Sequence, residues 1–211
     1  MYFKQILAGG YNHNFSYFIG DEKTREVAVV DPVNLSLLEK FIAMDGLFIT
    51  AIFGTHGHFD HIGEIPEFYK KHANAKIYVP KSTREKLSQL PNGTFHILSD
   101  REKINIGAVS MEAIFTPGHE PGATCFLVEG KLITGDTLFI EGCGRCDLPD
   151  SDVEEQYKSL FERIGGLPET TEIYPGHDYG SKPHSTLAYE KQHNRFYRCK
   201  TKDEFVALRM K

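Results

Sequence analysis

The chain has 211 residues, enough for one substantial domain with a buried core, and we expect a single domain over residues 1–211. Its 24 Lys and Arg against 29 Asp and Glu give a formal net charge of −5, which argues against a nucleic-acid partner bound through its phosphates. Four Cys are too few for a disulfide scaffold, and the sequence has neither a secretory leader nor a long apolar run, so we expect a cytoplasmic protein without a membrane partner.

The first quarter of the chain predicts several strands and one helix. Short apolar runs separated by polar turns indicate strands at 2–7, 14–20 and 26–32. Apolar residues then recur at helical spacing between a candidate N-cap at Asn34 and a candidate C-cap at Gly46. The nearly continuous apolar run at 47–54 predicts a strand buried on both faces.

The rest of the chain completes this first half and then repeats its order of strands followed by helices in a second half. Apolar runs predict further strands at 75–80, 109–116, 123–130, 131–136 and 171–176. Helical spacing predicts helices at 62–73, 82–90, 152–164, 185–195 and 202–210. Two halves of this kind predict an α+β fold in which two sheets pack face to face with helices outside.

A dense cluster of metal-binding side chains follows the strand at 47–54. The segment 55–61 reads Thr-His-Gly-His-Phe-Asp-His and contains three imidazoles and a carboxylate. In an extended loop His56 and His58 project to the same side and can reach one cation. Asp60 and His61 project differently and can serve a second one. Such a density of ligands favours a metal site over a structural role.

Three further candidate ligands each follow a predicted strand. His119 ends the segment Thr-Pro-Gly-His, Asp136 ends Thr-Gly-Asp, and His177 ends Tyr-Pro-Gly-His. Loops at strand ends are where functional side chains gather on a rigid scaffold. Each segment alone is typical of a turn, but together with the histidine cluster they complete two coordination shells.

The segments His-x-His-x-Asp-His, TPGH, TGD and PGH, in this order, resemble the metallo-β-lactamase superfamily. The resemblance implies an αββα sandwich of two mixed β-sheets with a metal site at one edge. By the scheme of that family, one ion is held by His56, His58 and His119. The other ion is held by Asp60, His61 and His177, and Asp136 bridges the two ions.

The donor set indicates the same chemistry. Imidazole and carboxylate ligands without thiolate suit Zn²⁺, which we expect here, and also Fe²⁺ or Mn²⁺. Two divalent ions that share a carboxylate lower the pKa of a bridging water and polarise a carbonyl, which favours hydrolysis. Asp60 is in addition a candidate catalytic residue, because its carboxylate can orient the resulting hydroxide.

The sequence around Asp136 narrows the substrate by resemblance. The segments TGDTLF at 134–139 and GCGR at 142–145 are similar to glyoxalase II, which cleaves the thioester S-D-lactoylglutathione. The continuation GRCDLP at 144–149 resembles the short bacterial type of that enzyme and also persulfide dioxygenase, a mononuclear iron enzyme acting on glutathione persulfide. We therefore predict hydrolysis of a small anionic thioester of the glutathione kind, with the dioxygenase as the alternative. For this alternative, the resemblance implies that His56, His119 and Asp136 of this chain would hold the iron.

Arg145 and Lys182 are the candidate substrate-binding residues. A guanidinium can take a carboxylate in two parallel hydrogen bonds, and Lys182 can act as a point charge at the other end of an anionic substrate. Cys143 and Cys146 form a single C-x-x-C pair, which favours packing roles. A nucleic-acid-processing member of the superfamily is disfavoured by the net charge of −5. Four other histidines show no ligand spacing and are expected at the surface: His72, His96, His184 and His193.

Overall fold

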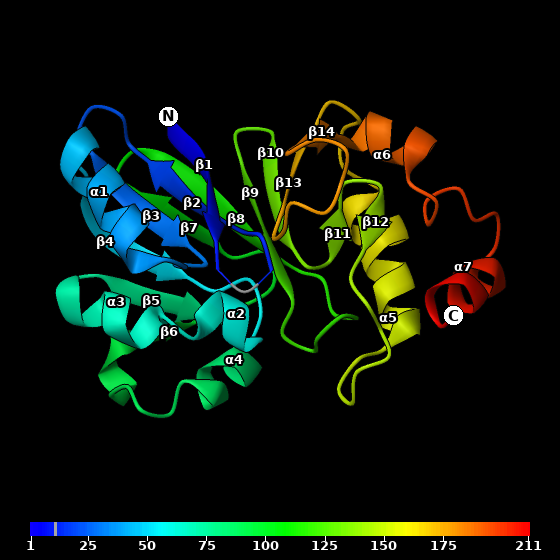
Figure 1. Ribbon diagram of the computed structural model, residues 1–211, viewed down its shortest axis with the longest axis horizontal. Coiled ribbons are helices and arrows are strands. Elements are labelled where there is room, and N and C mark those ends of the chain that lie inside the picture. Colours follow the sequence, from blue (N-terminus) through cyan, green and yellow to red (C-terminus); the bar gives the residue numbers. More distant parts are fainter. Residues whose placement is uncertain (11) are drawn as a thin grey trace.

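Two six-stranded mixed sheets form the centre of the molecule (Figure 1), a computed structural model that describes residues 1–10 and 12–211. The strands of the first sheet lie side by side in chain order: β1 (Tyr2–Gly9), β2 (Asn14–Gly20), β3 (Glu26–Val30), β4 (Phe48–Phe53), β5 (Lys76–Val79) and β6 (Phe95–Ile97). The strands of the second sheet have the order β14-β13-β10-β9-β8-β7: β7 (Lys103–Ile106), β8 (Val109–Phe115), β9 (Thr124–Val128), β10 (Lys131–Gly135), β13 (Glu172–Pro175) and β14 (Ser185–Thr186). A two-stranded ribbon, β11 (Leu138–Phe139) and β12 (Gly142–Cys143), follows β10.

The helices of the two chain halves lie on opposite sides of the sheets, to the left and to the right in Figure 1. The first half contributes α1 (Leu35–Asp45), α2 (Phe59–Ile62), α3 (Ile65–Lys71), α4 (Lys81–Lys86) and a 3₁₀ turn (Asn92–Thr94). The second half contributes α5 (Val153–Lys158), a π-helical turn that continues it (Ser159–Ile164), α6 (Leu187–His193) and α7 (Lys202–Arg209). Each sheet therefore has one face for its helices and one for the other sheet.

Three apolar layers hold these elements together. Between the sheets, Phe15, Tyr17 and Phe53 of the first sheet belong to one cluster with Met111 and Phe126 of the second. Two outer layers join each sheet to its helices: Phe18, Ile52, Leu38 and Phe68 on one side, and Cys125, Leu132, Leu160 and Phe205 on the other. Removing this apolar surface from water is the main favourable contribution to folding. The layers confirm the predicted α+β sandwich with helices outside.

Helix α1 begins and ends at the predicted caps. The side chain of Asn34 accepts a hydrogen bond from the backbone N–H of Leu37. Gly46 adopts a left-handed φ of 61° and its N–H is bonded to the carbonyl of Ile42, as in many helix C-termini. The helix carries the chain from β3 to the parallel neighbour β4, a connection that a tight turn cannot make.

The prediction that 47–54 is buried on both faces was wrong for the start of this strand. Phe48 is 65% exposed, whereas Ala51, Ile52 and Phe53 are buried. Phe48 pairs with Glu26, the first residue of β3, at the end of the sheet that lies away from the histidine cluster. Only the half of β4 that leads into the cluster is enclosed by both neighbouring layers.

Short elements account for most other differences from the prediction. Strands β6 and β7 were not predicted, because each contains only two strongly apolar residues. The helix expected at 82–90 ends at Lys86, and the one expected at 185–195 begins at Leu187, since Ser185 and Thr186 pair with β13. Among the described residues no helix has the length and apolar character needed to cross a membrane.

Candidate metal centre

The candidate ligands gather where several strands end at one edge of the sandwich. His56, His58, Asp60 and His61 follow β4 of the first sheet. The other three follow strands of the second sheet: His119 after β8, Asp136 after β10 and His177 after β13. Strands β10 and β13 are parallel neighbours, so their ends deliver Asp136 and His177 to the same place.

The histidine cluster is not the extended loop that the sequence predicted. His58 is extended, with φ −72° and ψ 145°, but the next four residues form α2. The N–H groups of His61 and Ile62 donate to the carbonyl of His58 at 3.0 and 3.1 Å. Asp60 and His61 therefore project from a helical turn and not from an extended segment, and the ring of His61 lies close to that of His56, with 4.1 Å between the ring centres.

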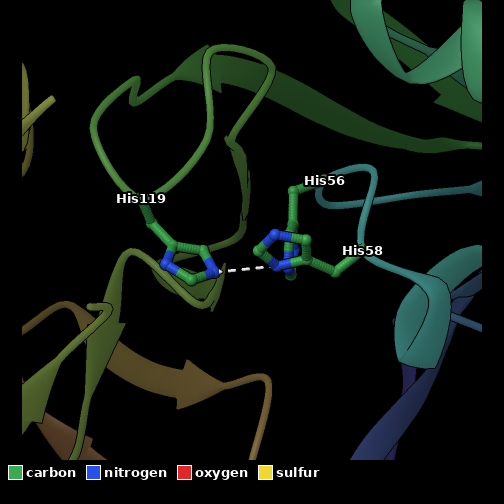
Figure 2. Close-up of side chains that lie close together, drawn as sticks. All are labelled: His56, His58 and His119. Atoms are coloured by element: carbon green, nitrogen blue, oxygen red, sulfur yellow. Dashed lines mark hydrogen bonds between the residues drawn. The ribbon is translucent and has the colours of Figure 1, made fainter. Parts of the chain in front are cut away.

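Three imidazoles form the first group of candidate ligands (Figure 2). The Nδ1 atom of His58 lies 3.0 Å from Nε2 of His56 and 3.0 Å from Nε2 of His119. Burial, and next the charge of His61, hold the pKa of His56 well below its usual range. The neutral imidazole that results is the form that binds a metal.

The second group consists of Asp60, His61 and His177. The Nε2 atoms of His61 and His177 are 3.0 Å apart. Oδ2 of Asp60 lies 3.5 Å from Nε2 of His177 and 3.7 Å from Nε2 of His61. These three ligand atoms are close enough to one another to hold one cation.

Asp136 lies between the two groups. Its Oδ2 is 3.9 Å from Nε2 of His56 and 3.6 Å from Nε2 of His119. Its Oδ1 is 3.3 Å from Nε2 of both His61 and His177. Each oxygen of one carboxylate thus faces a different group of imidazoles.

The environment of Asp136 fits divalent metal ions. Its Oδ1 is buried and has no hydrogen-bond partner among the described residues. A buried polar atom without a partner is costly, and a cation would remove that cost. Burial opposes ionisation of this carboxyl, but the imidazoles of His61 and His56 outweigh it and keep its pKa well below the usual value. The carboxylate is therefore available as a ligand.

Asp31 orients His61 and was not singled out from the sequence. Its Oδ2 accepts a hydrogen bond from Nδ1 of His61 at 2.7 Å, and both of its oxygens accept from Thr55. Asp31 is 2% exposed and has a left-handed φ of 48°. The available signal was an acidic residue directly after a buried strand, in the segment VVDP.

Backbone carbonyls orient two other imidazoles. Nδ1 of His119 donates to the carbonyl of Arg145 at 2.8 Å, and Nδ1 of His177 donates to that of Asn12 at 2.8 Å. In both rings the hydrogen bond fixes the tautomer, so that Nε2 carries the lone pair that faces the cluster. Asn14 plays a similar role for Asp60, because its amide donates to Oδ2 of that carboxylate at 3.2 Å.

A cavity of about 520 Å³ opens beside the cluster and contains one of the two predicted substrate-binding residues. Arg145 lies on its wall and forms two hydrogen bonds with Asp147, at 2.7 and 2.6 Å. Lys182 lies on a different cavity, with its ammonium 3.4 Å from the ring centre of Tyr189. Two cationic residues that sequence reasoning missed also line the cavity beside the cluster: Arg195 and Arg209.

The four cysteines contribute no ligand to these groups. Cys143 and Cys146 are each 4% exposed, and burial raises the pKa of both thiols to about 12. Thiols of this kind stay protonated near neutral pH and act as small apolar groups. Cys125 is buried under the second sheet. Their environment agrees with the packing role favoured for the C-x-x-C pair.

The histidines without ligand spacing lie outside the cluster. His72 is hydrogen-bonded to Glu39, and His96 to Glu102. His184 and His193 are exposed.

Known proteins resemble this chain over most of its length. Residues 9–177 match the sequence profile of the metallo-beta-lactamase superfamily. The chain is 32% identical over 197 residues to "Probable polyketide biosynthesis zinc-dependent hydrolase PksB" of Bacillus subtilis (strain 168), with 93% of this chain and 87% of that protein covered. It is 34% identical over 178 residues to a "Probable hydroxyacylglutathione hydrolase" of Schizosaccharomyces pombe, with 81% and 66% covered.

Solved structures resemble the fold closely. The ETHE1 protein from Myxococcus xanthus superposes with a TM-score of 0.87 at 28% identity, with 100% of this chain and 90% of that chain covered. A metallo-beta-lactamase from Staphylococcus aureus subsp. aureus COL gives a TM-score of 0.86 at 33% identity, with 100% and 66% covered. The profile match, the identities with both relatives and the two superpositions agree with the sandwich and its histidine-rich edge, and this chain is a member of the metallo-beta-lactamase superfamily.

Proposed function

We propose that the chain is a binuclear metal-dependent hydrolase of the glyoxalase II type that cleaves a thioester such as S-D-lactoylglutathione. In this proposal one ion is held by His56, His58 and His119. The second ion is held by Asp60, His61 and His177, with Asp136 as the bridge. The observation that carries the proposal is the position of Asp136, whose two oxygens face the two imidazole groups at 3.3 to 3.9 Å.

Divalent ions in such a pair supply a hydroxide at neutral pH and polarise the carbonyl under attack. The residues of the chain orient the reactants. Asp60 is 20% exposed, lines the cavity and is fixed by Asn14, so its carboxylate can accept a hydrogen bond from the attacking water. His61 and His177 are buried, and His177 lines the cavity beside Asp60.

The donor set favours zinc, since it offers imidazole and carboxylate without thiolate, and it also suits iron or manganese. The Bacillus subtilis relative is named as a zinc-dependent hydrolase, which supports the same choice.

An anionic carrier on the thiol side of the substrate is supported by the cationic wall of the cavity. Arg145, Arg195 and Arg209 line it together with the candidate ligands. The pair between Arg145 and Asp147 is exposed, and water screens the attraction between exposed charges, so a substrate carboxylate can replace Asp147. The relative named as a hydroxyacylglutathione hydrolase supports a carrier of the glutathione kind.

The test combines metal analysis with turnover. We expect about two metal ions per chain and release of free thiol from S-D-lactoylglutathione without oxygen. One iron per chain, with no thiol released, would overturn the proposal.

The second candidate function is the iron-dependent persulfide dioxygenase. Nε2 of His56 and of His119 lie 3.9 and 3.6 Å from the same oxygen of Asp136, which is the two-histidine, one-carboxylate set of many iron oxygenases. Oxygen consumption with glutathione persulfide, without thioester cleavage, would favour this candidate.

A further inference from the structure

A buried carboxylate stands behind the three-histidine group and has no part in the proposed mechanism. Glu120 is 4% exposed. Its Oε2 accepts a hydrogen bond from the backbone N–H of Gly57 at 2.5 Å, and its Oε1 forms an ion pair with Lys86. A buried carboxylate is retained only where such partners offset the loss of hydration. Lys86 and the Gly57 peptide provide them here.

Glu120 faces the ring of His58 from the side opposite to the cluster. Nδ1 of His58 points to His56 and His119, and Nε2 of His58 lies 3.7 Å from Oε1 of Glu120. Figure 2 shows the ring of His58 between His119 and its own backbone, with Nδ1 directed to His119. This separation lies within ion-pair distance and slightly beyond that of a hydrogen bond.

His58 has the weakest support of the five imidazoles in the two groups. Its side chain is 30% exposed, against 1% for His56, 4% for His119 and 2% for His177. In each of the other four rings, the nitrogen that faces away from the cluster has a hydrogen-bond partner, at a distance of 2.7 to 3.1 Å. Within the described chain, Glu120 is the group in the corresponding position behind His58.

The same carboxylate fixes the backbone between two candidate ligands. A Cβ atom placed on Gly57 would lie 2.7 Å from Cδ of Lys86 and 3.0 Å from Oε2 of Glu120. The Lys86–Glu120 pair therefore closes directly over the peptide that joins His56 to His58. This contact restrains the loop and the ring together.

We propose that Glu120, held by Lys86, is a positioning residue that orients His58 and the Gly57 peptide and thereby sets the metal affinity of the three-histidine group. This inference rests on the proposed function, in which that group binds an ion. Glu120 is not a ligand itself. A carboxylate behind a ligating imidazole fixes the ring and increases its basicity, and loss of such a partner costs about 10- to 100-fold in metal affinity.

The experiment measures the affinity of each of the two ions by competition with a chelator, with Co²⁺ as the probe. Glu120→Gln preserves the shape of the side chain and an acceptor for the N–H of Gly57 but removes the charge behind His58. We expect about 10-fold weaker binding of one ion, a change in the visible spectrum of its Co²⁺ complex, and an unchanged second ion. Glu102→Gln is the matched control. Oε1 of Glu102 lies 2.5 Å from Nε2 of His96, a histidine outside the cluster.

Two outcomes would overturn the proposed role of Glu120. Equal affinities of wild type and Glu120→Gln for both ions would overturn the role of Glu120. Equally weakened binding of both ions, together with a lower melting temperature, would also overturn it, since that pattern indicates a general loss of stability of the fold. Should Glu120→Gln fail to fold, Lys86→Gln provides the same measurement, with a smaller loss expected for the same single ion. One ion per wild-type chain would instead contradict the two-metal proposal, so the two failures are distinguishable.

Discussion

Individual hydrogen-bond partners orient most of the candidate ligands. Side chains lie behind His56, His61 and Asp60, and backbone carbonyls lie behind His119 and His177. Asp136 is the ligand whose removal we expect to matter most, because one carboxylate faces both imidazole groups. Asp136→Ala should lower metal affinity by more than about 100-fold, since loss of a residue that only orients a ligand already costs about 10- to 100-fold. The substitution should also abolish turnover. Metal analysis after dialysis measures the retention of metal, and a thioesterase assay measures turnover. His72→Ala, which alters a histidine paired with Glu39 away from the cluster, should behave as wild type.

Asp31 provides a second prediction at the same scale. Asp31→Asn keeps the volume but removes the charge that faces Nδ1 of His61 at 2.7 Å. We expect about 10- to 100-fold weaker binding of the ion held by the group of Asp60, His61 and His177. Chelator competition measures this loss. Asp45→Asn is the control, since Asp45 also accepts two hydrogen bonds, from Tyr2 and Lys4, and neither partner is a candidate ligand. An unchanged affinity in Asp31→Asn would contradict the role assigned to Asp31.

At the scale of elements, helix α5 joins two ligand loops through one residue. Gln156 is fully buried in its first turn. Its Oε1 accepts from the N–H of His119 at 2.9 Å, and its Nε2 donates to the carbonyl of Thr137 at 2.7 Å. Gln156→Ala should lower the free energy of unfolding by about 1–3 kcal/mol, because it leaves two buried backbone groups unpaired. Urea denaturation measures the change. Lys158→Ala, an exposed change on the same helix, should stay within about 0.5 kcal/mol of wild type.

The segment after α6 supplies part of the cavity wall. Asn194 is buried and its amide donates to the carbonyl of Gly142, which places Arg195 beside the cavity. Arg195→Ala should raise KM for an anionic thioester about two- to five-fold, the range of an exposed ion pair, and leave KM for a neutral thioester unchanged. Arg145→Ala should act in the same direction. Lys182→Ala should change neither, because Lys182 lies on another cavity. Equal losses on both substrates would mean that these arginines only support the wall.

Sequence patterns predicted the longer elements and missed the short ones. Helix α1 has caps at both ends and eleven residues, so local signals were sufficient. Strand β6 and helix α2 have three and four residues, too few for a periodic pattern, and depend on tertiary contacts. The candidate ligands were recognisable because their residue types are dense and specific. Asp31, Gln156 and Glu120 act through contacts between residues 30 to 63 positions apart, which no local pattern reveals.

For the whole molecule, bound metal should contribute measurable stability. Each proposed ion joins ligands from both sheets, so binding requires the folded sandwich. A ligand present at 100 times its dissociation constant stabilises the folded protein by about 2.7 kcal/mol. For a chain of this size, each kcal/mol shifts the melting temperature by about 2–4 °C. Removal of the metal by a chelator should therefore lower the melting temperature by about 5–11 °C. Calorimetry with and without chelator measures this. Asp136→Ala should show little change on chelation, and an unchanged wild-type melting temperature would contradict the prediction.

The order of the ligands along the chain also determines when each group is complete during synthesis. All six strands of the first sheet lie between residues 2 and 97, so this sheet emerges from the ribosome before most of the second. His58 meets a partner 61 positions later, at His119, whereas His61 waits 116 positions for His177. Because N-terminal regions fold first during translation, the three-histidine group can form on a nascent chain that still lacks the other group. In the proposed two-metal site, loading would then be sequential, with the second ion bound only after β13 has joined the sheet.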